Sequence, residues 1–273
     1  MSLQISISNS IRGYRSVPGG VPVDPDAQAF ITAASITNPT QQAAINQLVV
    51  DLKGYSIWTK MKALYPFCGG SASSHKFNLK DPRDLDAAFR LVFSGGWTHS
   101  STGATPNGTN AYADTKFKPS VSLSTSSAHF SKYNRTNDLV GNKVDGILDI
   151  PTSGSFFQQN YSAANGVIGE IASVASYTQT DTRGLFTMSR TATNAFKVFK
   201  NSSSVATNTN TISIIPVSLN FYIGARNDGA GVQSFYNSYQ CAFASLGDGL
   251  TDTEAANFYT AVQAFQTTLG RQV

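Results

Sequence analysis

Charged side chains are scarce in this chain of 273 residues, because Asp, Glu, Lys and Arg together make up only 13%. That share is about half of what is usual in globular proteins. Ser, Thr, Asn and Gly take their place, a composition common in extracellular and particle-borne β proteins. The formal net charge is +4, but Lys and Arg are scattered, without the run or helical stripe of a nucleic-acid-binding surface. We therefore expect no nucleic-acid partner.

Long apolar runs are missing too. No stretch approaches the roughly 18 to 20 consecutive apolar residues of a membrane-spanning helix, so we expect no membrane partner. Residues 1–6 lack the basic start and apolar run of a secretory signal, which favours synthesis in the cytoplasm. The only two cysteines, Cys68 and Cys241, match no metal or redox spacing. Two buried free thiols are the expected state, and a bridge between them stays open as the alternative.

Helix signals are confined to the first quarter and the end of the chain. Residues 1–23 are interpreted as a short strand and an extended arm, and residues 24–66 as a helical segment. Asp24 and Asn38 each precede a proline, which is typical of an N-cap, and a third short helix is predicted over 57–64. Thr251 and Glu254 match a capping box, and apolar residues then recur at helical spacing. This pattern predicts an amphipathic helix over 251–269.

Short strands are predicted between these helices, from residue 67 onwards. Loops of Gly, Asn, Ser, Thr and Asp separate them, as in a sandwich or jelly roll. Long helices between the strands are lacking, which argues against a parallel α/β sheet. The predicted strands span 89–93, 128–133, 146–150, 167–171, 185–189, 195–199, 211–215 and 219–223.

Several segments resemble known proteins. The run 221–226, the strand 239–247 and the helix start 250–254 resemble the closing portion of concanavalin A-like or laminin-G-like jelly rolls. Segments 58–67, 77–82 and 262–271 resemble parts of bacteriophage virion proteins. The resemblance implies a mainly β chain, a concanavalin A-like antiparallel β-sandwich (jelly roll) over 67–273 with N-terminal helices and a C-terminal amphipathic helix. It also implies that the sandwich is carried on a phage particle.

Residues for catalysis are few. Glucan hydrolases of the lectin-like fold carry Glu-x-Asp-x-x-Glu on one strand, and neither Glu170 nor Glu254 lies in that pattern. Asp145 and Asp149 flank a predicted strand, and we interpret them as structural. The three histidines are far apart in the sequence and show no ligand spacing: His75, His99 and His129. We therefore expect no enzymatic activity.

Glycan binding needs exposed aromatics for sugar faces, with amides and charged groups for hydroxyls. Tyr133, Asn134 and Arg135 offer this mixture at the end of a predicted strand. Trp97 and Tyr112 lie in the segment 95–114, which shows little periodicity and is predicted to be a long loop. An assembly contact or a disordered tip is the alternative for that loop.

A calcium site is a further hypothesis. Lectin-like sandwiches often carry an oxygen-ligand site on their loops, which makes Asp181 and Asp228 candidate ligands. Asp228 also lies in an Asn-Asp-Gly sequence, which is an ordinary turn, so this alternative stays open.

The sequence as a whole predicts a non-catalytic virion structural protein, a lectin-like module in a tail, baseplate or head appendage. Its expected location is the virion, with other virion proteins as partners and a homo-oligomeric state. The alternative is a receptor-binding protein that recognises a bacterial surface glycan. A polysaccharide depolymerase is the third hypothesis.

Overall fold

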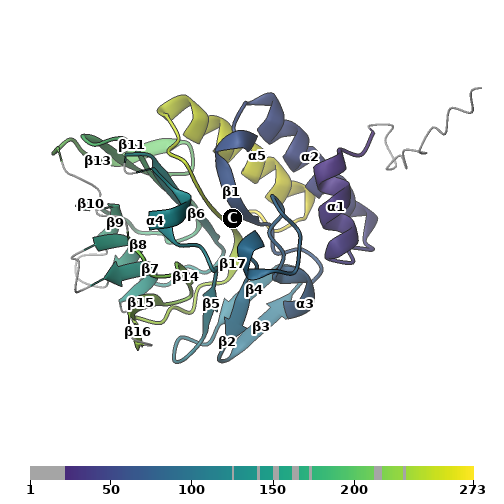
Figure 1. Cartoon of the computed structure of the whole chain (residues 1–273), viewed down its shortest axis with the longest axis horizontal. Coiled ribbons are helices and arrows are strands. Elements are labelled where there is room, and N and C mark those ends of the chain that lie inside the picture. Colours follow the sequence, from purple (N-terminus) through teal and green to yellow (C-terminus); the bar gives the residue numbers. More distant parts are fainter. Residues whose placement is uncertain are drawn as a thin grey trace, which may run out of the picture.

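The computed structural model describes residues 22–124, 126–139, 142–149, 154–161, 166–171, 174–211, 217–229 and 232–273. Two β-sheets, antiparallel apart from one parallel pair, form a sandwich, and a layer of helices covers the outer side of the first sheet (Figure 1). The predicted mainly β sandwich with N-terminal helices and a C-terminal amphipathic helix is confirmed. None of the described helices is long and apolar enough to cross a membrane.

The first sheet has the strand order β13-β12-β11-β6-β17-β4-β3, and β1 also pairs with β17. Asn201, at the tip between β12 and β13, adopts a φ of 56°, as a tight hairpin turn requires. The strands are β1 (Met61–Tyr65), β3 (Trp97–Ser100), β4 (Gly103–Pro106), β6 (Ala128–Asn134), β11 (Gly184–Ala192), β12 (Ala195–Lys200), β13 (Ser203–Asn208) and β17 (Cys241–Gly247).

The second sheet has the order β10-β9-β8-β7-β14-β5-β2, and β15 pairs with both β7 and β16. The pairing of β15 with β7 is parallel, and the other pairings in this sheet are antiparallel. The strands are β2 (Val92–Ser94), β5 (Tyr112–Asp114), β7 (Lys143–Asp149), β8 (Gly154–Tyr161), β9 (Gly166–Ile171), β10 (Val174–Thr178), β14 (Tyr222–Ile223), β15 (Arg226–Gly229) and β16 (Val232–Ser234).

The helical layer consists of α1 (Pro25–Ala33), α2 (Pro39–Gly54) and α5 (Asp252–Thr268). Asp24 and Asn38 cap α1 and α2 as predicted, and the capping box of Thr251 and Glu254 begins α5. Short helical turns complete the chain: η1 (Trp58–Lys60), α3 (Ala72–His75), η2 (Asp86–Ala88) and α4 (Pro119–Ser122).

The first sheet is the middle layer of the molecule, so both faces of its central strands β6 and β17 are buried. Neighbouring side chains of a strand point to opposite faces. On β6, Phe130 packs in the core between the two sheets, whereas Tyr133 packs in the core beneath the helices. The two cysteines are buried and unbridged, as expected.

Several boundaries differ from the sequence prediction. The predicted helix over 57–64 is wrong, because only Trp58–Lys60 form a helical turn and β1 follows, paired with β17. A short apolar run fits a buried strand as well as a helix, so periodicity alone does not separate them. The predicted helical segment 24–66 therefore ends early, and β1 belongs to the sandwich. The predicted strand 211–215 and arm 1–23 lie largely outside the described residues.

The predicted long loop 95–114 is also wrong, because it contains β3, β4 and β5. Its strands are three or four residues long and rich in Gly, Thr and Ser, so they show no apolar alternation. Pairing with neighbouring strands, which the sequence does not reveal, makes them regular.

Candidate functional site

The outer side of the second sheet presents two stacked tyrosines. Tyr112 on β5 and Tyr222 on β14 have ring centroids 4.7 Å apart, with an angle of 19° between the ring planes. Their neighbours Ala113 and Ile223 pair across the two strands and point into the core between the sheets. Because side chains alternate along a strand, both tyrosines point outwards. Both are partly exposed.

Polar side chains surround this pair. The Asp114 carboxylate accepts a hydrogen bond from Asn220 Nδ2 at 3.1 Å and pairs with Lys116 Nζ at 3.0 Å. Burial, the charge of Asp114 and the nearby Tyr112 raise the pKa of Tyr222 to about 12, while a hydrogen bond with Gln233 acts in the opposite direction. We call Tyr112, Tyr222, Asp114, Asn220 and Gln233 the tyrosine face.

Arg226 borders the tyrosine face. Gly146 on β7 is the register partner of both Tyr222 and Arg226, and directly opposed residues point to the same side of a sheet. The Arg226 guanidinium lies 4.4 Å from the ring centroid of Phe235, and its Nε donates to Asp228 at 2.5 Å. The Asp228 carboxylate, a predicted calcium ligand, is thus bound by an arginine of its own strand.

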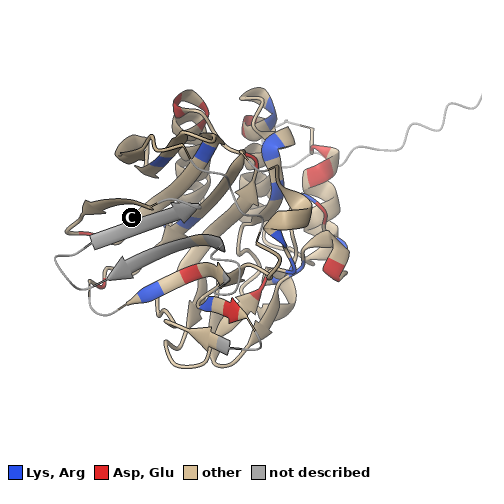
Figure 2. Cartoon of the chain, turned by 60° about the vertical axis from the view of Figure 1, so that its left-hand side comes forward, with Lys and Arg blue, Asp and Glu red and all other residues tan. Residues whose placement is uncertain are grey.

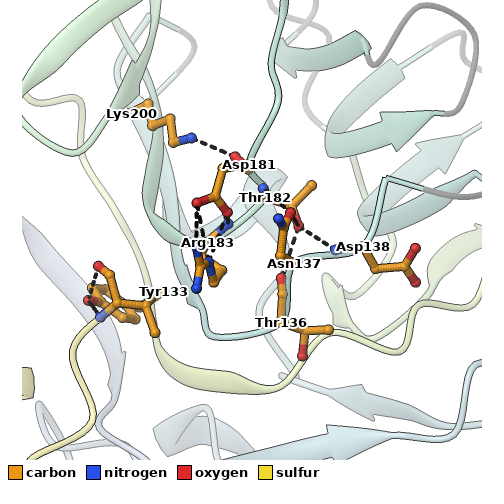
Figure 3. Close-up of polar contacts among 9 residues, drawn as sticks. Tyr133, Thr136, Asn137, Asp138, Asp181, Thr182, Arg183 and Lys200 are labelled. Carbon is orange, nitrogen blue, oxygen red and sulfur yellow. Dashed lines mark hydrogen bonds and ion pairs between the residues drawn. The ribbon is translucent and has the colours of Figure 1, made fainter.

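The other predicted calcium ligand is engaged in the same manner (Figure 3). The Asp181 carboxylate turns to Arg183, which donates from Nε at 3.0 Å and from Nη2 at 2.9 Å. Lys200 Nζ donates to the Asp181 carbonyl at 2.5 Å. Within the described ranges, no group of three or more His, Cys, Asp or Glu residues has the arrangement of a metal site. A divalent cation at either aspartate would first have to displace an arginine.

The expectation that Tyr133, Asn134 and Arg135 form an exposed platform is wrong. Tyr133 is fully buried, and its hydroxyl donates to Gln263 Oε1 of α5 at 2.9 Å. Arg135 Nε donates to the Arg271 carbonyl at 2.7 Å. Asn134 is also fully buried, and its amide has no hydrogen-bond partner in the part of the chain that the structure describes. The cause is the position of β6 in the middle layer, where α5 and the C-terminal residues cover the end of the strand.

Trp97 supports the tyrosine face from below. Its ring packs against the core between the sheets, and its Nε1 donates to the carbonyls of Ser94 at 3.1 Å and Tyr112 at 3.2 Å. Gly224 has a φ of 95°, and a Cβ there would lie 3.0 Å from the Trp97 ring. The structure therefore brings Trp97 and Tyr112 together, with Trp97 in a positioning role.

Two histidines that are far apart in the sequence contact each other in the structure, and their spacing does not predict it. Nδ1 of His75 lies 2.9 Å from Nδ1 of His99, and the Gly70 N–H donates to His75 Nε2 at 3.2 Å. His75 Nε2 is therefore an acceptor, so the proton of the neutral ring is on Nδ1 and is donated to His99. Burial above all, and then the charges of His99 and Arg271, lower the pKa of His75 to about 3. The pair is a structural contact that stays uncharged at neutral pH.

Acid should weaken the fold before most carboxylates titrate. Burial lowers the pKa of His129 to about 4, so both buried histidines resist protonation in the folded state. In the unfolded chain a histidine binds its proton near pH 6.5, so stability present above that pH is lost as the pH falls towards 4. We expect a lower urea midpoint at pH 5 than at pH 7, and a smaller difference for His129→Gln. Equal midpoints for the wild type would contradict this expectation.

Comparisons with known proteins bear on the fold. No protein-family model matches the sequence, and no curated protein matches it. A Trypanosoma rangeli sialidase in complex with a difluoro-KDN ligand is similar in structure, with a TM-score of 0.52 and 11% identity. The likeness covers 80% of this chain and 39% of the sialidase chain.

Two further solved structures are similar at lower TM-scores. Domain 4 of AbnA, a GH43 extracellular arabinanase from Geobacillus stearothermophilus, in complex with arabinotriose, has a TM-score of 0.47 and 12% identity, over 73% of this chain and 98% of that one. The CBM40 of a Ruminococcus gnavus sialidase, bound to sialyllactose, has a TM-score of 0.37 and 12% identity, over 49% of this chain and 82% of that one. At such identities, structural likeness is evidence about the fold alone. The sialidase comparison shows that the fold is shared.

Proposed function

We propose that this chain is a non-catalytic glycan-binding module of a bacteriophage particle, and that the tyrosine face is its binding surface. The stacked pair of Tyr112 and Tyr222 carries the proposal, because both rings are partly exposed on the outer side of a sheet and belong to neither core. Sugars offer apolar C–H faces that pack on aromatic rings. Asp114, Asn220 and Gln233 place hydrogen-bonding groups beside the rings, which is the mixture that fixes a polar ligand.

The states of the acidic residues favour binding over hydrolysis. A glycosidase needs two carboxyl groups, one of them protonated, across the scissile bond. Asp114 is paired with Lys116 and Asn220, and Asp145 is buried with Lys132. Each of these carboxylates is thus already engaged in an ion pair with a lysine.

The proposed location on a phage particle rests on the resemblance of segments 58–67, 77–82 and 262–271 to virion proteins. The layered fold is compatible with it: α1, α2 and α5 lie on the opposite side of the molecule from β5 and β14 (Figure 1). The helical side would then attach to other virion proteins, and the tyrosine face would point outwards. Detection of the chain at a fixed copy number in purified particles tests this location.

Tyr222→Ala should weaken glycan binding about tenfold or more, because about 1.4 kcal/mol of stacking free energy corresponds to a factor of ten. Tyr112→Ala should act alike, since each ring supports the other. An array of bacterial surface oligosaccharides would identify a ligand, and calorimetry would give its dissociation constant for each variant.

Tyr55→Ala is the matched control, because Tyr55 is 38% exposed and follows α2 in the helical layer. Its affinity for the ligand should equal that of the wild type. If the wild type retains no oligosaccharide, or if Tyr222→Ala binds as well as Tyr55→Ala, the tyrosine face is not a glycan site. Presence in the particle without any glycan binding would favour a purely structural appendage.

A further inference from the structure

We infer that the tyrosine face accepts a neutral glycan and rejects sugars that carry a carboxylate. This inference rests on the proposed function, since it names the class of glycan for the same surface. A carboxylated sugar needs a cation that is free to pair with it, because bringing an unpaired anion next to protein carboxylates costs desolvation and repulsion. Whether a cation is free to pair with a sugar carboxylate depends on the charged side chains beside the two tyrosines.

On the Asp114 side, the cation is already shared between two carboxylates. Lys116 Nζ lies 3.0 Å from the Asp114 carboxylate and 3.9 Å from that of Asp86. A further cation, Arg90, pairs with Asp86 at 2.8 Å and with Asp84 at 3.0 Å. Lys116 and Arg90 are therefore both engaged with carboxylates.

On the opposite side, Arg226 shares Gly146 as a register partner with Tyr222 and therefore points to the same side of the sheet. Its guanidinium is held between the Phe235 ring and the Asp228 carboxylate. The Arg226 side chain is 14% exposed and that of Asp228 is 9% exposed, so little of the pair faces solvent. A sugar carboxylate could recruit Arg226 only by breaking this ion pair. Elsewhere on the described ribbon, too, basic and acidic residues are interspersed (Figure 2).

The charge of Asp114 acts on the tyrosines themselves. After burial, it is the next cause of the raised pKa of Tyr222, so the negative charge opposes a second anion near that phenol. A sugar carboxylate stacked on the same ring would meet the same repulsion. Sugar hydroxyls would not, because they donate hydrogen bonds to carboxylate and amide oxygens. The face thus offers acceptors and apolar rings, which is what a neutral sugar requires.

Matched oligosaccharides test this selectivity. Calorimetry on the whole chain would compare tetrasaccharides of galactose, mannose and glucose with the corresponding tetra-uronates, which differ chiefly in the carboxylate. We expect at least one neutral member to bind and its uronate to bind about tenfold more weakly or worse. Asp114→Asn should narrow that ratio, because it removes the repelling charge and keeps a side-chain oxygen. Higher salt should narrow it as well, through screening.

Asp86→Asn serves as a second variant should Asp114→Asn fail to fold, because the Asp86 side chain is 57% exposed. Asp86→Asn should also narrow the ratio between the affinities for the neutral sugar and its uronate, but by less than Asp114→Asn. A uronate that binds as well as its neutral partner, and is lost in Tyr222→Ala, would overturn the selectivity and leave the glycan-binding function intact. Failure of every tetrasaccharide and of the array, or binding that is indifferent to Tyr222→Ala, would overturn both proposals.

Discussion

Lys132→Met should destabilise the folded chain by about 3–5 kcal/mol, the cost expected when one partner of a buried ion pair is removed. The Lys132 side chain on β6 has no exposure, and its Nζ contacts both oxygens of the Asp145 carboxylate on β7, at 3.0 and 2.8 Å. Methionine has a similar volume, so little space is lost while Asp145 becomes an unpaired charge inside the sandwich. Urea unfolding followed by circular dichroism would measure the change in the free energy of unfolding.

The ion pair also reaches the proposed binding surface. Asp145 Oδ1 accepts hydrogen bonds from the Gly224 N–H at 2.7 Å and from Asn237 Nδ2 at 2.9 Å. Gly224 directly follows β14, the strand of Tyr222. A shift of Asp145 would therefore disturb the backbone that holds Tyr222 against Tyr112. We therefore expect Lys132→Met to bind the glycan more weakly than the wild type, even under conditions in which the variant is folded.

The double variant Lys132→Met/Asp145→Asn separates charge from packing. Its amide is uncharged and still offers an oxygen to Gly224, so it should recover at least half of the lost stability. Two results would contradict the argument: a single variant within about 1 kcal/mol of the wild type, or a double variant no more stable than the single one.

Local sequence signals predicted the elements that depend on local physics. The capping box of Thr251 and Glu254 and the N-caps Asp24 and Asn38 are confirmed, because each is complete within four residues. The same holds for the strands β6 and β12, whose aromatic and β-branched residues stand among polar ones.

Contacts between distant segments were not predictable in this way. Tyr133 lies in an alternating strand whose polar side looked exposed, but α5 and the C-terminal residues cover that side. Alternation does not show that a sheet is covered on both faces. The pairing of His75 with His99 joins α3 to β3 across 24 residues, and nothing in the spacing marks it.

The candidate site was half visible in the sequence. The sequence analysis predicts Tyr112 as an aromatic of a loop but does not predict Tyr222, which lies between Phe221 and Ile223. Those two neighbours are fully buried in the core between the sheets. Alternation at this place would have marked Tyr222 as an outward aromatic. That it stacks on Tyr112 follows only from the pairing of β14 with β5.

Arg271→Ala should also cost about 3–5 kcal/mol, since it leaves several buried carbonyl oxygens without donors and opens a cavity. Arg271 is 1% exposed although it lies near the C-terminus. Its Nη2 donates to the carbonyls of Pro66 at 2.6 Å and Ala242 at 2.9 Å, its Nη1 to Phe67 at 3.0 Å, and its Nε to Gln266 Oε1 at 2.6 Å. One side chain thus ties the end of α5 to the first sheet and to the segment that follows β1.

Gln272→Ala is the matched control for this variant, because Gln272 is the exposed next residue and should change stability by less than about 0.5 kcal/mol. Arg271→Lys keeps the charge but replaces a planar fork by a single ammonium, which does not reach the same carbonyls together. We therefore expect the urea midpoint of Arg271→Lys to lie between those of Arg271→Ala and Gln272→Ala. Equal midpoints for Arg271→Ala and Gln272→Ala would mean that the buried guanidinium contributes nothing net. In that case the loss of hydration on burial costs as much free energy as the hydrogen bonds to the carbonyls contribute. The same loss of hydration lowers the pKa of Arg271.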